Sequence, residues 1–209
     1  MTALSFYSSE TPIPTVEDFQ QLLHPLTEFS GSTQEPDFRD VESLEGAGNP
    51  MPEPYRSLLV HETDMTSTLE TFFRERPRLE VLSKLRRGSR LYRQVLLRGV
   101  GSGRVMEYGA IRIQLDVLGS EARFAVLEGS RPLGGVLGDF QIRFVSRPQN
   151  YFSIRPGAHL QQLLGMTTPN EFQDGEPNLL FGRKNFLETE SGDVLAEVVE
   201  ILPPVTGGR

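Results

Sequence analysis

Arg93 lies in a predicted β-strand, on the face that also carries apolar side chains. It sits in the segment Leu91–Arg98, and strand alternation places it on one face with Val95 and Leu97. A guanidinium on an apolar face is costly unless an anion meets it there. That anion is either a carboxylate of the protein or a ligand. In the first case Arg93 has a structural role, and in the second it belongs to a binding site.

Two later segments carry charges of the same kind. Arg183 falls on the apolar face of one predicted strand, and Glu200 falls on an apolar face of the next. Glu197 is a rival to Glu200, because it points to the other face of the same strand, which is also apolar. Periodicity alone does not choose between the two glutamates.

These inward charges suit two arrangements. In the structural one, Arg93 or Arg183 pairs with Glu200 or Glu197 inside the sheet, or reaches the edge of the sheet with its aliphatic stem buried. In the functional one, a closed pocket holds a small anionic ligand whose carboxylates the arginines bind bidentately. The glutamate then meets a hydroxyl group or a proton in transfer.

The hydrophobic pattern predicts the elements that position these residues. Helical spacing predicts four helices: Thr15–Pro25, Ser67–Pro77, Leu133–Phe140 with Ser130 as its cap, and a short one over 159–164. Period-two spacing predicts strands over 90–98, 104–117, 178–188 and 193–202, with an extended stretch over 141–155. The first two strands form a half-buried antiparallel hairpin.

Hairpins with interspersed helices, and no regular βαβ alternation, predict an α+β fold with an antiparallel sheet. We expect residues 1–54 to form an N-terminal arm with one helix and a flexible loop over 30–54, where Gly, Ser, Pro and acidic residues are frequent. Residues 55–205 are expected to form one domain. The turn Gly99–Gly103 is a weak phosphate-loop candidate, because it joins two strands and lacks the Lys-Ser/Thr of a P-loop.

Composition narrows the classes of partner. The 209 residues carry a net charge of −7 and no dense Lys/Arg cluster, which argues against nucleic acid. There is no cysteine, no apolar run long enough for a bilayer and no signal-peptide pattern at the N-terminus, so we expect a cytoplasmic protein. The three histidines, His24, His61 and His159, are too far apart in sequence for a metal-ligand spacing.

Four short motifs occur in a recognisable order: Leu58–Thr66 leading into Leu69-Glu70, Tyr92–Leu97, Arg131–Gly134 and Val199–Pro203. Together they resemble the chorismate pyruvate-lyase (4-hydroxybenzoate synthase) family, in the branch found in cyanobacteria and algal plastids. The resemblance covers roughly Leu58 to Pro203, most of the chain.

The resemblance implies an antiparallel sheet with helices packed on one side and a ligand pocket beneath helical flaps. It also implies a monomeric enzyme that converts chorismate to 4-hydroxybenzoate and pyruvate, with no cofactor or metal. The product would feed the synthesis of a plastoquinone-type quinone. Chorismate and 4-hydroxybenzoate are therefore the expected small-molecule partners, with no nucleic acid and no membrane span.

The resemblance also assigns residues. Catalytic positions fall on Arg93 and Glu200, and substrate-binding positions on Met65, Leu133, Gly134 and Arg183. Arg93 matches the residue that binds the carboxylate of the aromatic product. Glu200 matches the acid that meets the ring hydroxyl, and its place three residues before Pro203 favours it over Glu197.

Two features leave alternatives open. The predicted helix after Leu133 is richer in glycine than the family pattern, which fits either a looser flap or a different ligand. The same fold also occurs in ligand-sensing domains of GntR-type regulators, so a non-catalytic protein that binds a small aromatic acid is the alternative. A third possibility is a structural or interaction protein whose inward charges form a salt-bridge cluster.

Overall fold

A computed structural model describes residues 38–44, 51–166 and 179–205 of the chain. In chain order its elements are β1 (Phe38–Leu44), α3 (Tyr55–Leu59), α4 (Met65–Phe73), β2 (Pro77–Arg87), β3 (Arg90–Gly99), β4 (Val105–Gln114), a 3₁₀ turn (Leu115–Val117), α5 (Ser120–Glu128), α6 (Leu133–Asp139), β5 (Phe144–Pro156), α7 (Ala158–Leu163), β6 (Leu180–Thr189) and β7 (Val194–Leu202). The strands form one antiparallel sheet in the order β1-β5-β6-β7-β4-β3-β2. The predicted α+β class is confirmed.

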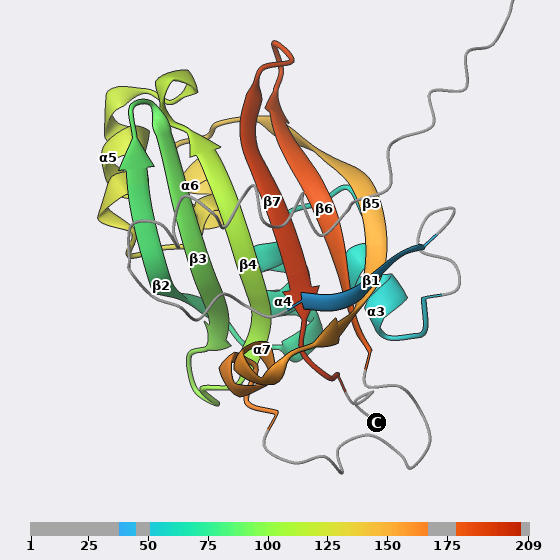
Figure 1. The fold of residues 1–209 in the computed structure, drawn as a ribbon. Coiled ribbons are helices and arrows are strands. Elements are labelled where there is room, and N and C mark those ends of the chain that lie inside the picture. The colour runs from blue at the N-terminus through green and yellow to red at the C-terminus, as the bar shows by residue number, and fades with distance from the viewer. Residues whose placement is uncertain (1–37, 45–50, 167–178, 206–209) are drawn as a thin grey trace, which may run out of the picture.

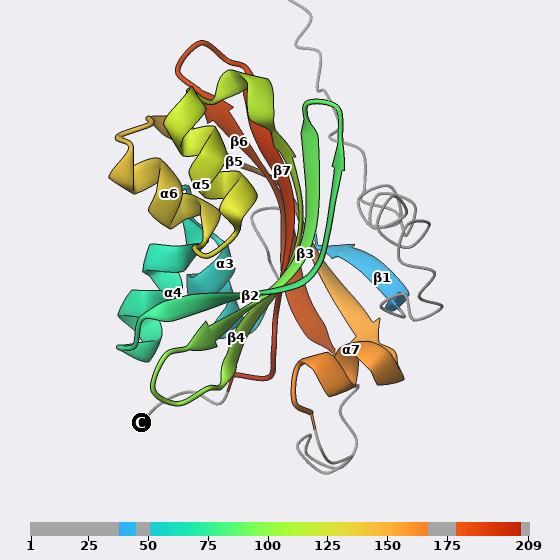
Figure 2. The same cartoon turned by 90° about the vertical axis from the view of Figure 1, so that its left-hand side faces the viewer.

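The sheet separates two layers (Figures 1 and 2). Helices α3, α4, α5 and α6 cover one face, as predicted, and the short helix α7 lies on the opposite face. Leu160 of α7 belongs to a cluster with Tyr92, Tyr108 and Ile201, which point away from the other helices. Because both faces are covered, β4 is buried over most of its length instead of being half-buried as the alternation of its second half suggested.

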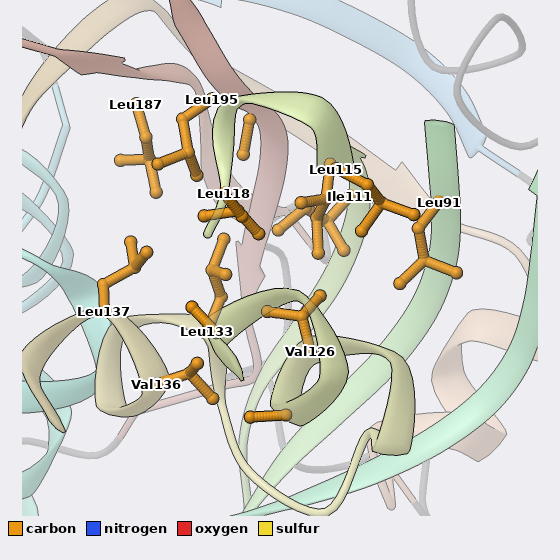
Figure 3. Packing of buried hydrophobic residues seen from close by; sticks show 14 of the residues in the cluster. Leu91, Ile111, Leu115, Leu118, Val126, Leu133, Val136, Leu137, Leu187 and Leu195 are labelled. Carbon is orange, nitrogen blue, oxygen red and sulfur yellow. The ribbon is translucent and has the colours of Figure 1, made fainter. Parts of the chain in front are cut away.

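The layer of α5 and α6 is fixed to the sheet by apolar packing (Figure 3). Leu133, Val136 and Leu137 of α6 belong to one cluster with Leu91 of β3 and Ile111 of β4. Spacings of three and four residues bring the α6 side chains to one helix face. This packing places the start of α6 over the strands that carry the inward charges.

Several local predictions need correction. Residues 38–44, expected to belong to a long loop, form β1, whose polar sequence is held by backbone pairing with β5 at the edge of the sheet. Residues 115–117 turn as a 3₁₀ helix instead of extending the strand. The first helical position of α6 follows Pro132, so Ser130 is not its cap.

Helix α4 begins at Met65, two residues earlier than Ser67, because the Asp64 side chain accepts a hydrogen bond from the Ser67 backbone N–H at 2.9 Å. The pattern also missed α3, β2 and α5. The helix predicted over Thr15–Pro25 lies outside the described residues, and the domain boundary at residue 54 stays a prediction.

At Gly182, β6 passes very close to its neighbours. A methyl group there would lie 2.5 Å from the backbone oxygen of Glu200 and would press on the Phe152 ring. Gly182→Ala is therefore expected to lower the free energy of unfolding by about 1–3 kcal/mol, measured by chemical denaturation. Gly138→Ala, where a methyl group meets open space, is the control. Equal stability of the two variants would contradict this packing.

Candidate functional site

A cavity lies between the sheet and the starts of α4 and α6. Its volume is about 70 Å³. The residues that line it come from both helices and from five strands of the sheet: Asp64, Met65, Thr66, Leu79, Arg93, Val95, Leu97, Glu107, Gly109, Ile111, Pro132, Leu133, Gly134, Asn185, Leu187, Val198 and Glu200. The lining is largely apolar, but it includes one cation and two carboxyl groups on the sheet.

Arg93 is the cation, and it occupies the position that strand alternation predicts. Its neighbours on the same face of β3, Val95 and Leu97, line the cavity with it. The side chain is 2% exposed, and neither Nε nor Nη1 has a hydrogen-bond partner within the described part of the chain. Burial lowers the pKa of Arg93 to about 10, so the group stays charged at neutral pH. The site thus presents a buried cation with unused donors.

The structure separates the two rival glutamates. Glu200 lines the cavity and lies opposite Gly109 of β4 and Arg183 of β6 in the sheet register. Glu197 forms ion pairs with Arg112 and, at 3.2 Å, with Lys184, and is not among the cavity-lining residues. Its backbone position, three residues from Glu200, turns it to the other face.

Arg183 is fully buried and lies behind Glu200. Its Nε donates to the Glu200 carboxylate, and its Nη1 donates to the backbone oxygens of Leu59 at 2.9 Å and His61 at 3.0 Å. Arg183 is not among the residues that line the cavity. It fastens the connection between α3 and α4 to the sheet and fixes Glu200. A direct contact between Arg183 and a ligand stays a prediction.

Glu107 is a functional candidate that the sequence reasoning missed. It is 4% exposed and lines the cavity from β4. Burial, and secondarily the neighbouring Glu200 carboxylate, raise the pKa of Glu107 well above its ordinary value, while Arg183 opposes the shift. Alternation was the available signal, because Glu107 shares a strand face with Gly109 and Ile111. Asn185 was missed as well; it is buried and donates to Ser146 Oγ at 2.9 Å.

Met65, Leu133 and Gly134 line the cavity together, and their contact with a ligand stays a prediction. Met65 is the first residue of α4, and Leu133 and Gly134 open α6. The backbone N–H groups of a first helical turn lack partners within the helix. Gly134 allows the two starts to approach, since a methyl group there would lie 3.0 Å from Oδ1 of Asp64.

Two adjacent glycines of α6, Gly134 and Gly135, allow a matched test of the close contact between the starts of α4 and α6. Gly135→Ala meets nothing within 4 Å and is expected to stabilise the helix by up to about 1 kcal/mol. Gly134→Ala is expected to gain less, because the methyl group displaces Asp64, and to alter ligand affinity several-fold. Thermal unfolding and ligand titration measure both effects. The same affinity in the two variants would show that the contact between the helix starts does not shape the cavity.

The turn at Gly99–Gly103 holds an internal anion. The Glu75 carboxylate accepts hydrogen bonds from the backbone N–H groups of Gly101 at 2.5 Å and Ser102 at 2.6 Å, and from Ser102 Oγ at 2.7 Å. These bonds, the hydroxyl bond first, lower the pKa of Glu75. The turn is therefore closed by the protein's own carboxylate.

Within the described ranges, no three histidine, cysteine or carboxylate side chains gather in a way that suits a metal ion. None of the helices described is both long and apolar enough to cross a bilayer.

Comparisons with known proteins add little to this geometry. No family model and no curated protein sequence matches the chain. Among solved structures, PhnF from Mycobacterium smegmatis is similar over 69% of this chain and 65% of the PhnF chain, with 10% sequence identity and a TM-score of 0.47. The chain thus spans slightly less than two thirds of PhnF. A similarity of this extent carries no inference about function, so the interpretation of the site depends on its own residues.

Proposed function

We propose that the protein is a lyase that converts chorismate to 4-hydroxybenzoate and pyruvate. The observation that carries this proposal is the buried Arg93, whose Nε and Nη1 have no partner among the described residues, in a largely apolar cavity that also contains Glu200. An apolar cavity with one cation suits an aromatic ring with one carboxylate. The order of the four sequence motifs supports the same reaction, whose product would serve a plastoquinone-type quinone.

The reaction requires that the substrate is held in position and that a proton is removed from the ring. A base removes the proton from the ring carbon that bears the hydroxyl group, and the electron pair of that C–H bond completes the aromatic ring. The bond between the ring and the enolpyruvyl oxygen breaks, and the enolpyruvate takes up a proton to become pyruvate. Aromatisation supplies the driving force, so the site needs mainly to orient the substrate and exclude water.

Each role fits a residue at the cavity. Arg93 anchors the ring carboxylate, with help from first-turn N–H groups at Met65 and Leu133. Glu200 meets the ring hydroxyl and takes the proton, and Arg183 holds Glu200 in place. Gly134 belongs to the flap that closes the cavity.

The flap must move for a ligand to enter. A cavity of about 70 Å³ is smaller than the roughly 150 Å³ that holds benzene in an engineered apolar core. The starts of α4 and α6, which meet at Gly134 and Asp64, are the parts of the lining outside the sheet. Their separation would admit the ring, and their return would exclude water.

One observation favours a second candidate, a protein that binds a small aromatic acid without turnover. The Glu200 carboxylate already accepts a hydrogen bond from Arg183, so one of its oxygens is engaged by the protein. A site of this kind still binds a hydroxybenzoate through Arg93 but leaves the C–H bond intact.

Mixing the purified protein with chorismate separates these functions. Formation of 4-hydroxybenzoate, followed by its absorbance, together with pyruvate in equal amount, is the expected result. Binding of 4-hydroxybenzoate without turnover would support the non-catalytic candidate. Neither binding nor turnover would overturn both. Arg112→Met, which removes an arginine paired with Glu197 away from the cavity, is the control variant.

A further inference from the structure

Glu107 has no role in the reaction as described above, yet it is buried at the cavity wall. Its Oε2 has no hydrogen-bond partner among the described residues, and no ion pair with it is seen there. An ionised carboxylate in this position would lack compensation for its lost hydration. A neutral carboxylic acid is the form that such a position tolerates, and it carries an O–H donor.

The sheet register places Glu107 at one end of the cavity and Arg93 at the other. Arg93 lies opposite Ile111 in β4, and Glu107 is four residues before Ile111 on that strand, a separation of about 13 Å between backbone levels. The Arg93 side chain lies between these levels with the cavity, which must widen before an aromatic ring can enter. The cavity therefore has a cationic end and an acidic end.

Gly109 makes room for the acidic end. A methyl group at Gly109 would lie 3.2 Å from Oε1 of Glu107 and 3.1 Å from Cγ2 of Val95. Glu200 lies directly opposite Gly109 on β7. The Glu107 carboxyl group thus occupies the space above this glycine, beside the carboxylate of Glu200.

The charges around Glu107 agree with a neutral form. Two ionisable side chains act on Glu107 directly, Glu200 of β7 and Arg183 of β6. Two others, Arg93 of β3 and Asp64 at the start of α4, line the same cavity. Asp64 is engaged by the Ser67 backbone, and Arg183 is engaged by Glu200 and backbone oxygens. Burial, with the adjacent Glu200 carboxylate, keeps the pKa of Glu107 well above 4.5.

We infer that Glu107 is a neutral acid that donates a hydrogen bond to the hydroxyl group of the ligand, so that the acidic end of the cavity accepts a hydroxyl para to the anchored carboxylate and rejects a carboxylate at that position. Glu107 is then a specificity-determining residue beside Glu200. The ligand class is a six-membered ring acid with a hydroxyl group para to its ring carboxylate, as in 4-hydroxybenzoate and chorismate, and this part of the inference rests on the proposed function. The protonation state of Glu107 does not rest on it.

A measurement without ligand tests the protonation state. Protein labelled with ¹³C at the glutamate carboxyl carbons is titrated by NMR, and Glu107→Gln assigns the signal. The Glu107 carboxyl is expected to keep the chemical shift of a protonated acid at pH 7. Titration of this signal in the ordinary acidic range would overturn the inference, whatever ligand the protein binds.

The pH dependence of folding stability is a second test of whether Glu107 is protonated. The raised pKa means that the folded protein still holds the proton at a pH where the unfolded chain has lost it, so folding stability falls as pH rises above 4.5. Glu107→Gln removes this dependence and is expected to exceed the wild type in free energy of unfolding at pH 7, with a smaller difference below pH 4.5. A constant difference across this range would contradict a neutral Glu107.

Binding tests the specificity. Wild-type protein is expected to bind 4-hydroxybenzoate at least tenfold more tightly than benzene-1,4-dicarboxylate, and Glu107→Ala to lose most of that preference. Equal affinity of the wild type for both acids would overturn the assigned specificity. Glu197→Gln, which removes a carboxylate away from the cavity, is the control. If neither acid binds but the Glu107 signal stays protonated, the proposed function fails and the neutral acid stands.

Discussion

Replacing Arg93 with methionine is expected to weaken the binding of 4-hydroxybenzoate by roughly 100-fold while it makes the ligand-free protein more stable. Arg93 is 2% exposed, and two nitrogens of its guanidinium group lack partners in the described part of the chain. Exchange of buried charged groups for apolar side chains of similar size often stabilises a protein by about 1–4 kcal/mol. Calorimetric titration and chemical denaturation measure the two effects.

The expected changes in affinity and in stability have opposite signs, which distinguishes a binding role from a structural one. A structural arginine would lower stability when removed, whereas an arginine reserved for a ligand lowers only affinity. Arg112→Met is the matched control, because Arg112 is paired with Glu197 outside the cavity lining. Retained affinity in Arg93→Met together with a large loss of stability would show that Arg93 serves the fold instead of a ligand.

Replacing Arg183 with methionine is expected to have the reverse effect on stability, a loss of about 3–5 kcal/mol. The change leaves the Glu200 carboxylate buried without its partner and removes the donor from the backbone oxygens of Leu59 and His61. Chemical denaturation measures the loss, and 4-hydroxybenzoate affinity should fall as well, because Glu200 is no longer fixed.

A double-mutant cycle separates the ion pair from the rest of the contacts. Arg183→Met combined with Glu200→Gln should recover part of the lost stability, since no unpaired buried carboxylate remains at that position. A loss in Arg183→Met no larger than that of Arg112→Met would contradict the buried pairing.

Local periodicity was enough to find the inward charges but not to assign their partners. The side chains of a strand alternate between its two faces, and this does not depend on which strand it pairs with. The sequence therefore predicts the correct faces for Arg93, Arg183 and Glu200. Whether Arg183 or Arg93 meets Glu200 depends on the register between β6 and β7, which sets Arg183 opposite Glu200. The same register, together with the ion pairs of Glu197, separates the two glutamates.

The two missed strands, β1 and β2, lie at the edges of the sheet. Edge strands carry charged residues that weaken the two-residue pattern, and β2 contains Arg78, Lys84, Arg86 and Arg87. β1 at the other edge is held by its pairing with β5 and not by its composition. Glu107 gives a weaker signal in the sequence, because Gly109 separates it from Ile111, the next bulky apolar residue on its face of β4.

The order of strands in the sheet has a consequence for how the protein acquires its site during folding. The β4–β7 pairing joins residues about 90 positions apart in sequence, and such distant contacts form slowly because a long loop must first close. Arg93 and Glu107 come from one side of this junction, and Arg183 and Glu200 from the other. The ability to bind a ligand should therefore return late in refolding, after the hairpin of β3 and β4 has formed.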